Sequence, residues 1–257
     1  MPHNPLRERV LRGEPLFGAQ IGFPSPELVE LCCLAGFDYI FIDAEHGPIG
    51  WTECQAMVRA CDAHGKPSIA RVPTLDHSLI AKYLETGLSG VAVPHINTAA
   101  QAHEAAKAAR YAPLGTRGCD EGSSRSSAYG LAQYREGYFA FSNREIIVAV
   151  WVEEVEGMKN LDEILQVPGV DAVNFGPGDL ALSMGLPGQS NHPDVLAAVA
   201  DGRNKALAAG KILIGEPSDA DAAKKLMAEG AMLLNTSVAN LLADAATTFL
   251  MDARRRV

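Results

Sequence analysis

Short apolar runs alternate with longer helix-like segments along the whole chain, and this alternation constrains the fold more than any other feature. The runs are nearly all apolar and rich in β-branched residues, which is typical of strands that are covered on both faces. The expected strands are Phe17–Phe23, Tyr39–Asp43, Ser68–Val72, Gly90–His95, Glu145–Val152, Ala172–Phe175, Ile212–Gly215 and Met232–Asn235. The expected helices are Pro26–Ala35, Glu53–His64, His77–Glu85, Ala99–Ala109, Asn160–Gln166, Pro193–Ala209, Asp219–Glu229 and Ala239–Asp252.

Eight strands, each followed by a helix, predict a closed parallel barrel of the (β/α)8 or TIM type. The 257 residues of the chain are close to the roughly 250 that such a barrel needs, so we expect one domain over residues 1–257. An open doubly wound sheet is the alternative. The G-x-G-x-x-G fingerprint that dinucleotide-binding sheets carry after their first strand is absent from this sequence.

The charge and the cysteines narrow the partners and the compartment. The chain has 22 Lys and Arg against 31 Asp and Glu, a net charge of −9, so we expect no nucleic-acid partner. The longest apolar run, Ile146 to Val152, is far short of the roughly 20 residues that a membrane span needs. Five cysteines without a Cys-x-x-Cys pair are typical of a reducing cytoplasm, where we expect the protein to act.

Polar residues follow several of the expected strands at the point where each strand ends. In a barrel of this type the reacting groups lie at the carboxyl ends of the strands, so these residues are expected to meet at one mouth. Carboxylates in such number repel one another unless a cation lies among them. The residues are Asp43, Glu45, His46, Arg71, Glu153, Glu154, Asp179 and Glu216.

Glu153 and Asp179 are the candidate metal ligands. Two carboxylates from neighbouring strands can hold a hard divalent cation and leave positions for water and substrate oxygens. The alternative is that one is a surface carboxylate, or that Asp179 caps a short helix. The turn at Gly176–Gly178 could seat a substrate carboxylate on its backbone N–H groups, or be an ordinary turn between strand and helix.

His46 and Arg71 are the candidates for proton transfer and for charge stabilisation. The ordinary pKa of histidine suits proton transfer near neutral pH, although a lone histidine is more often structural. Arg71 can pair with a substrate oxyanion, and a salt bridge to Asp43 or Glu45 does not exclude that role. His95 also ends a strand and is held in reserve as a second histidine.

Five motifs stand in order and in register over roughly residues 15 to 240. They are Phe41-Ile-Asp-Ala-Glu-His-Gly47, Ala70-Arg-Val-Pro73, Pro113-Leu-Gly-Thr-Arg-Gly118, Val152-Glu153 and Phe175-Gly-Pro-Gly-Asp-Leu180. Together these motifs resemble the HpcH/HpaI aldolase family. Members of that family are metal-dependent aldolases that cleave 4-hydroxy-2-oxo acids, and they are related to the barrels that use phosphoenolpyruvate.

The resemblance implies a (β/α)8 barrel, a homo-hexamer built as a dimer of trimers with exchanged C-terminal helices, and a divalent cation (Mg²⁺, Mn²⁺ or Co²⁺) on Glu153 and Asp179. Pyruvate would chelate that cation, with its carboxylate on the backbone of Gly178 and Asp179. Arg71 would neutralise the enolate oxygen and His46 would act as the base. Asp43 and Glu45 would support them, and the loop around Arg117 would close over the site.

Two positions depart from the family pattern. Trp151 stands where the family commonly has glutamine, so it is expected to line the substrate pocket and narrow it. Glu85 replaces an aspartate that the family pairs with its histidine. Because Glu85 ends a helix at the far end of the barrel, we expect any pairing with His46 to cross a subunit interface.

The implied reaction is reversible cleavage of a 4-hydroxy-2-oxo acid to pyruvate, or hydroxypyruvate, and an aldehyde. The sequence places no lysine for a Schiff base, which favours metal over imine chemistry. Oxaloacetate decarboxylation and cleavage of an acyl-CoA by the same centre are the alternatives among enzymes. A non-catalytic barrel that binds a small carboxylate is the alternative from another class.

Overall fold

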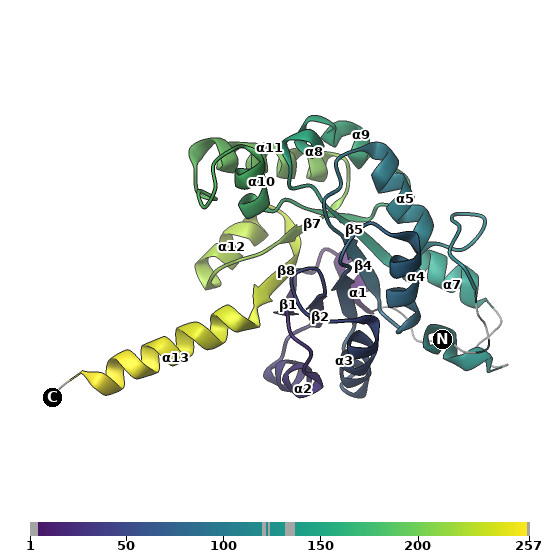
Figure 1. Cartoon of the computed structure of the whole chain (residues 1–257), viewed down its shortest axis with the longest axis horizontal. Coiled ribbons are helices and arrows are strands. Elements are labelled where there is room, and N and C mark those ends of the chain that lie inside the picture. Colours follow the sequence, from purple (N-terminus) through teal and green to yellow (C-terminus); the bar gives the residue numbers. More distant parts are fainter. Residues whose placement is uncertain (1–4, 120–121, 123, 132–136, 256–257) are drawn as a thin grey trace.

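The computed structural model describes residues 5–119, 122, 124–131 and 137–255. Its strands form a closed parallel barrel in which each strand is hydrogen-bonded to the next and β8 returns to β1 (Figure 1). The predicted barrel is therefore confirmed and the open sheet was wrong. The strands are β1 (Leu16–Ile21), β2 (Tyr39–Asp43), β3 (Ser68–Arg71), β4 (Gly90–Val93), β5 (Ile147–Trp151), β6 (Ala172–Asn174), β7 (Ile212–Gly215) and β8 (Ala231–Ser237).

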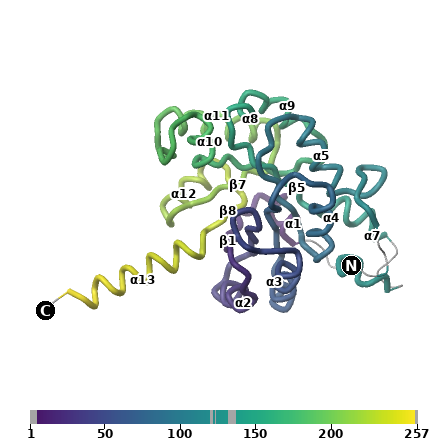
Figure 2. The backbone as a smooth tube through the Cα atoms, in the orientation of Figure 1, coloured from purple at the N-terminus to yellow at the C-terminus, as the bar shows by residue number. Residues whose placement is uncertain are grey.

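Helices surround the barrel and connect its strands, as Figures 1 and 2 show. The expected helices are all present, three of them with the expected bounds, while the segment around Asn160 forms two short helices. The helices are α1 (Pro5–Leu11), α2 (Pro26–Ala35), α3 (Trp51–Ala63), α4 (His77–Glu85), α5 (Ala99–Ala109), η1 (Arg125–Gly130), α7 (Tyr138–Glu145), α8 (Val155–Lys159), α9 (Leu161–Leu165), α10 (Pro177–Ser183), α11 (Pro193–Ala208), α12 (Ala220–Ala228) and α13 (Val238–Arg254).

Side-chain caps fix where several of these helices begin. The side chain of Asp76 accepts a hydrogen bond from the backbone N–H of Leu79 at the start of α4. Thr98 and Gln101 form a reciprocal capping box at the start of α5. Each cap satisfies N–H groups that have no partner within the helix, so the polar residue before an apolar-periodic segment marks its first turn.

Two layers of core follow from the alternation of side chains along each strand. On β2, Tyr39 and Phe41 belong to the cluster inside the barrel, whereas Ile40 and Ile42 belong to the layer between the strands and the helices. Leu6 of α1 joins the inner cluster. The interior of the barrel is therefore a packed core, and an open site can lie only where the alternation reaches its end.

The last helix leaves the body of the protein. Figure 1 shows α13 projecting away from the barrel beyond β8, and most of its residues are exposed. Its exposed apolar side chains include Leu242 and Phe249. Within the described ranges, no helix combines the length and the apolar character that crossing a bilayer takes.

Candidate active site

The alternation along the strands ends with polar side chains at the carboxyl-terminal mouth of the barrel. Arg71 lies two residues after Ile69, and Glu153 two residues after Trp151, and both apolar residues belong to the inner cluster. Period-two alternation therefore turns Arg71 and Glu153 toward the barrel axis as the strands end. Gln20, Asp43, Asn174 and Glu216 occupy the corresponding positions of their strands.

Asp43 and Arg71 form a bidentate ion pair across β2 and β3. Arg71 Nε donates to Asp43 Oδ1 at 3.0 Å and Arg71 Nη2 donates to Oδ2 at 2.6 Å. The two residues are register partners in adjacent strands, so the backbone itself places them together. Burial alone raises the pKa of Asp43, but the hydrogen bonds and the charge of Arg71 outweigh it and hold that pKa below its ordinary value.

The loop after β2 wraps around the Asp43 carboxylate. The backbone N–H groups of Glu45 and His46 donate to Asp43 Oδ1 at 3.2 and 3.4 Å. Glu45 Oε2 also lies 3.0 Å from Arg71 Nη1, so all three guanidinium nitrogens face carboxylates. The His46 side chain is 61% exposed, and its Nε2 lies 3.6 Å from Glu45 Oε2. His46 is therefore free to meet a ligand that enters the mouth.

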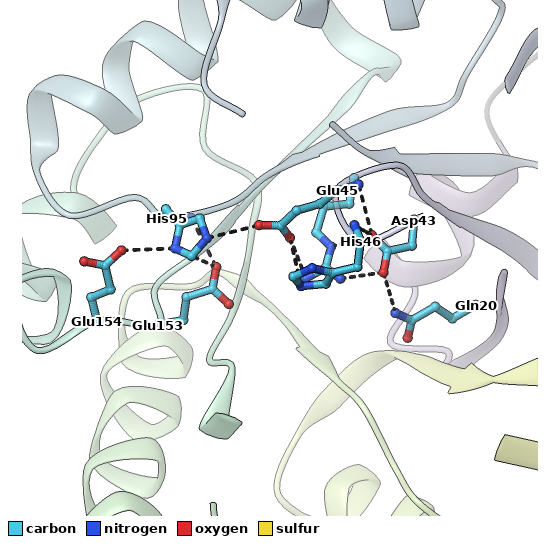
Figure 3. Close-up of polar contacts among 8 residues, drawn as sticks. Gln20, Asp43, Glu45, His46, His95, Glu153 and Glu154 are labelled. Carbon is cyan, nitrogen blue, oxygen red and sulfur yellow. Dashed lines mark hydrogen bonds and ion pairs between the residues drawn. The ribbon is translucent and has the colours of Figure 1, made fainter. Parts of the chain in front are cut away.

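His95 links the ends of β2, β4 and β5 (Figure 3). Its Nε2 lies 3.1 Å from Glu45 Oε1 and its Nδ1 lies 3.0 Å from Glu154 Oε1. Its backbone N–H donates to Glu153 Oε1 at 3.1 Å. The φ angle of His95 is 55°, which residues other than glycine rarely adopt and which is more common at functional sites than elsewhere.

Glu153 is the most deeply buried carboxylate at the mouth, with 1% of its surface exposed. Its pKa is raised from 4.5 to about 7, first by burial and further by the charges of Glu45 and Asp179, although the His95 N–H opposes the shift. Gly176 makes room for it, because a Cβ there would lie 2.5 Å from Glu153 Oε2. Asp179 follows in the first turn of α10.

Glu216 adds a further carboxylate from the end of β7. The residue is exposed at the rim, but desolvation of its carboxylate by the surrounding protein raises its pKa. The charges of Asp43 and Asp179 raise that pKa further. The mouth therefore concentrates negative charge beyond what Arg71 neutralises. Such a concentration of carboxylates favours the binding of a cation.

Trp151 lies beneath the polar side chains of the mouth and belongs to the apolar cluster inside the barrel. Its side chain is fully buried, with its ring 5.6 Å from that of Phe41 and 5.7 Å from the guanidinium carbon of Arg71. The guanidinium of Arg71 therefore lies over the indole ring, and this cation–π contact stabilises its positive charge. Contact between Trp151 and a substrate stays a prediction.

Two expected contributors lie away from this mouth. Glu85 is the last residue of α4, and its ion partner is Lys82, at 4.0 Å. Arg117 lines a cavity with residues that immediately precede β3, β4 and β5. The expectation that the Arg117 loop closes over the site of its own chain was therefore wrong. The loop follows α5, and a helix of a (β/α)8 barrel returns the chain to the amino-terminal end of the strands.

The structure also shows a group of possible metal ligands that the sequence did not single out. One ligand atom from each of Glu45, His95 and Glu153 lies within 4.8 Å of the other two. Position at a strand end had drawn attention to all three residues. The three residues follow three different strands, so only the folded structure shows that the His95 ring turns toward the carboxylates of Glu45 and Glu153.

The fold and this mouth define a class: a (β/α)8-barrel enzyme with its reacting groups at the carboxyl ends of the strands. The sequence pattern of the HpcH/HpaI aldolase/citrate lyase family matches residues 21–240. The chain belongs to this family, and it is an aldolase, a carbon–carbon lyase.

Individual relatives agree with that assignment. The chain is 33% identical to a 2-keto-3-deoxy-L-rhamnonate aldolase of Klebsiella pneumoniae over 93% of its own length and 88% of the relative's. It is 36% identical to a hydroxypyruvate/pyruvate aldolase of Deinococcus radiodurans over 95% and 88%. A crystal structure of an HpcH/HpaI aldolase/citrate lyase family protein from Burkholderia cenocepacia superposes with a TM-score of 0.91 at 31% identity, covering 98% and 99% of the two chains.

Proposed function

We propose that this aldolase reversibly cleaves a 4-hydroxy-2-oxo acid into pyruvate or hydroxypyruvate and an aldehyde. The observation that carries the proposal is the Asp43–Arg71 ion pair, which Glu45 connects to the buried Glu153 carboxylate. Cleavage of the bond between C3 and C4 leaves an enolate, and fixed positive charge at its oxygen is what lowers the barrier to such a step. The names of the two relatives, a 2-keto-3-deoxy acid aldolase and a hydroxypyruvate/pyruvate aldolase, support a 2-oxo acid as the ligand.

The donor set at the mouth fits a divalent cation. Glu153 and Asp179 are close enough for the charge of one to raise the pKa of the other, and a cation between them would remove that repulsion. All-oxygen ligands suit Mg²⁺ and Mn²⁺, and Co²⁺ is also compatible. When bound, the ion supplies a Lewis acid that polarises the 2-oxo group. We assign the ion to Glu153 and Asp179, and we assign His95 the role of holding Glu45 and Glu154.

The chain's own residues then divide the remaining work. Arg71, fixed by Asp43, presents its charge to the oxygen that becomes the enolate. His46 accepts the proton of the 4-hydroxyl, directly or through a water, as C3 and C4 separate and the aldehyde leaves. The backbone of Gly178 and Asp179 binds the substrate carboxylate. A Cβ at Gly178 would meet nothing within 4 Å, so the space beside this turn is open.

Assembly completes the proposal. We propose a homo-hexamer, a dimer of trimers, in which each barrel is one domain and α13 packs on a neighbouring chain. The exposed apolar residues of α13 support the exchange, because a protruding helix gains stability only by burying such a face. Glu85 would pair with the partner's histidine across an interface. No disulfide joins any of the five cysteines, all of which the structure describes, in keeping with action in the reducing cytoplasm.

A substrate panel tests the proposed reaction against its alternatives. Pyruvate release would be measured with several 4-hydroxy-2-oxo acids and with oxaloacetate, and glyoxylate release would be measured with malyl-CoA, each with Mg²⁺ or Mn²⁺. The proposal predicts the highest kcat/KM for a hydroxy-oxo acid. A preference for oxaloacetate or malyl-CoA would instead assign a decarboxylase or an acyl-CoA lyase. No turnover of any of them, with binding of pyruvate retained, would assign a non-catalytic carboxylate-binding barrel.

A further inference from the structure

A cavity of about 450 Å³ lies at the amino-terminal end of the barrel, opposite the mouth. Three residues that line it, Pro67, Ser89 and Ile146, immediately precede β3, β4 and β5. Asp43 and Arg71 end their strands, so the length of the barrel separates the cavity from the active site. Its volume falls in the range of about 300 to 1,000 Å³ that is usual for small-molecule pockets.

Arg117 is the charged group that lines this cavity most deeply, with 5% of its surface exposed. Its Nη1 donates to Ser142 Oγ at 3.5 Å, and its guanidinium carbon lies 4.7 Å from the centre of the Tyr111 ring. Its Nε and Nη2 are buried, and among the residues that the structure describes neither has a hydrogen-bond acceptor. A buried cation held this loosely is unfavourable unless an anion pairs with it.

The carboxylates that line the cavity have arginine partners of their own. Asp62 is paired with Arg125, which also donates to the Thr86 carbonyl at 2.8 Å. Glu145 Oε1 lies 2.7 Å from Arg144 Nε. No ion pair joins either carboxylate to Arg117 within the described part of the chain. The positive charge of Arg117 is therefore left for a ligand.

The rest of the lining divides into a hydroxyl-rich part and an apolar part. Ser142 accepts the hydrogen bond from Arg117, and the Tyr138 hydroxyl donates a hydrogen bond to Ser126 Oγ at 2.8 Å. Other positions of the wall carry apolar side chains, namely Leu84, Leu88, Phe141 and Ile146. A ligand that satisfies both parts has an anionic head and a short apolar body.

We propose that this cavity is a second ligand site, which binds a small organic monocarboxylate. The carboxylate accepts hydrogen bonds from Arg117 Nε and Nη2, a geometry that the guanidinium fork matches. The carbon body packs against the apolar wall. No covalent step is involved, and the length of the barrel separates the site from the mouth of its own chain.

Calorimetric titration of the intact protein with benzoate tests the proposal, with EDTA present so that the mouth lacks the cation with which, under the proposed function, it binds a carboxylate. Benzoate should bind once per chain, and Arg117→Met should weaken it by about tenfold or more, because the charged hydrogen bonds are lost. Arg59→Met is the matched control, since Arg59 is exposed on α3 and does not line the cavity, and it should leave binding unchanged. Benzyl alcohol, which lacks the charge, should bind at least about tenfold more weakly.

Two results of the titration would overturn the proposal. One is benzoate affinity that is equal in wild type and Arg117→Met, with both folded by circular dichroism. The other is binding of inorganic phosphate but not benzoate, which would make the site one for a phosphate group.

A crystal soaked with 4-bromobenzoate gives a readout that needs no variant. The anomalous bromine peak should lie in the cavity, with the carboxylate within hydrogen-bonding distance of Arg117. Bromine at the mouth alone, or an acidic side chain of a neighbouring subunit on Arg117, would overturn the assignment.

Discussion

Arg71 donates hydrogen bonds to both carboxylate oxygens of Asp43, and the two residues are register partners on neighbouring strands. The same guanidinium rests over the Trp151 ring and faces Glu45 with its third nitrogen. Four contacts from three directions leave it little freedom to reorient. A charge held this way needs little reorganisation as an enolate forms, which is the source of most electrostatic catalysis.

Asp43→Asn should lower kcat for pyruvate release by about 100-fold, since the amide keeps the shape of the side chain but releases Arg71. Asp171→Asn is the matched control. Asp171 accepts from Arg110 at 2.8 Å and precedes β6, so it belongs to the opposite end of the barrel. That control should lower Tm and leave kcat of the folded enzyme within about twofold. Equal kcat losses in the two variants would show that fold stability alone explains the effect.

Metal affinity distinguishes two possible donor sets that share Glu153. If the ion is held by Glu153 and Asp179, Asp179→Asn should weaken Mn²⁺ binding about tenfold or more. His95→Gln should then weaken Mn²⁺ binding less than Asp179→Asn does, because the His95 side chain contacts Glu45 and Glu154 and its hydrogen bond to Glu153 comes from the backbone. Electron paramagnetic resonance of free Mn²⁺ measures both without reference to turnover. The opposite ranking would place the ion among Glu45, His95 and Glu153.

The raised pKa of Glu153 predicts how stability depends on pH when no metal is bound. Between about 4.5 and 7 the folded protein keeps a proton on Glu153 that the unfolded chain has lost, so the free energy of unfolding falls as the pH rises. The loss is complete above pH 7 and is of the order of 1–3 kcal/mol, or a few degrees in Tm. Calorimetry at pH 5 and pH 8 measures it.

Glu153→Gln should reduce that difference in Tm, because the amide does not titrate. Glu156→Gln, at an exposed position of α8 nearby, should leave it unchanged. Adding a divalent cation at pH 8 should restore the lost Tm in the wild type. If wild type and Glu153→Gln show the same pH dependence, another group causes it.

The protruding helix α13 predicts a change in assembly. Phe249 is 71% exposed in the single chain, so burial of its ring against a neighbour should contribute to the proposed hexamer. Phe249→Glu should therefore shift the mass measured by light scattering toward smaller species. Thr247→Glu adds the same charge about half a turn away and should leave the mass unchanged. A hexamer that persists in Phe249→Glu would argue against helix exchange.

The sequence predicted the barrel well because its signals are local. The alternation of runs predicts strands, and caps such as Thr98 predict helix starts, so each element could be recognised from its own residues. The elements that were missed, such as α1 and α7, add nothing to the repeating pattern of strand and helix. The order of the strands placed Arg71 beside the end of β2, but the sequence left open whether Asp43 or Glu45 pairs with it, and in the structure Arg71 contacts both.

The polar network of the site depends on side-chain directions that the sequence does not reveal. His95 ends a strand, but its left-handed backbone and its approach to Glu45 depend on contacts across the barrel. The expected position of the loop around Arg117 also depended on the three-dimensional fold rather than on local sequence. Its motif marks a family resemblance, whereas its location depends on which end of the barrel α5 reaches.

The central claim is that a divalent cation at Glu153 is required for carbon–carbon cleavage. The most direct measurement is pyruvate release after removal of metal with EDTA, then after return of Mg²⁺ or Mn²⁺, in wild type and in Glu153→Gln. We predict a loss of about 100-fold or more, restored by metal in the wild type but not in the variant. Full turnover by the metal-free enzyme, with inactivation by borohydride in the presence of pyruvate, would contradict the claim and identify a Schiff base on lysine.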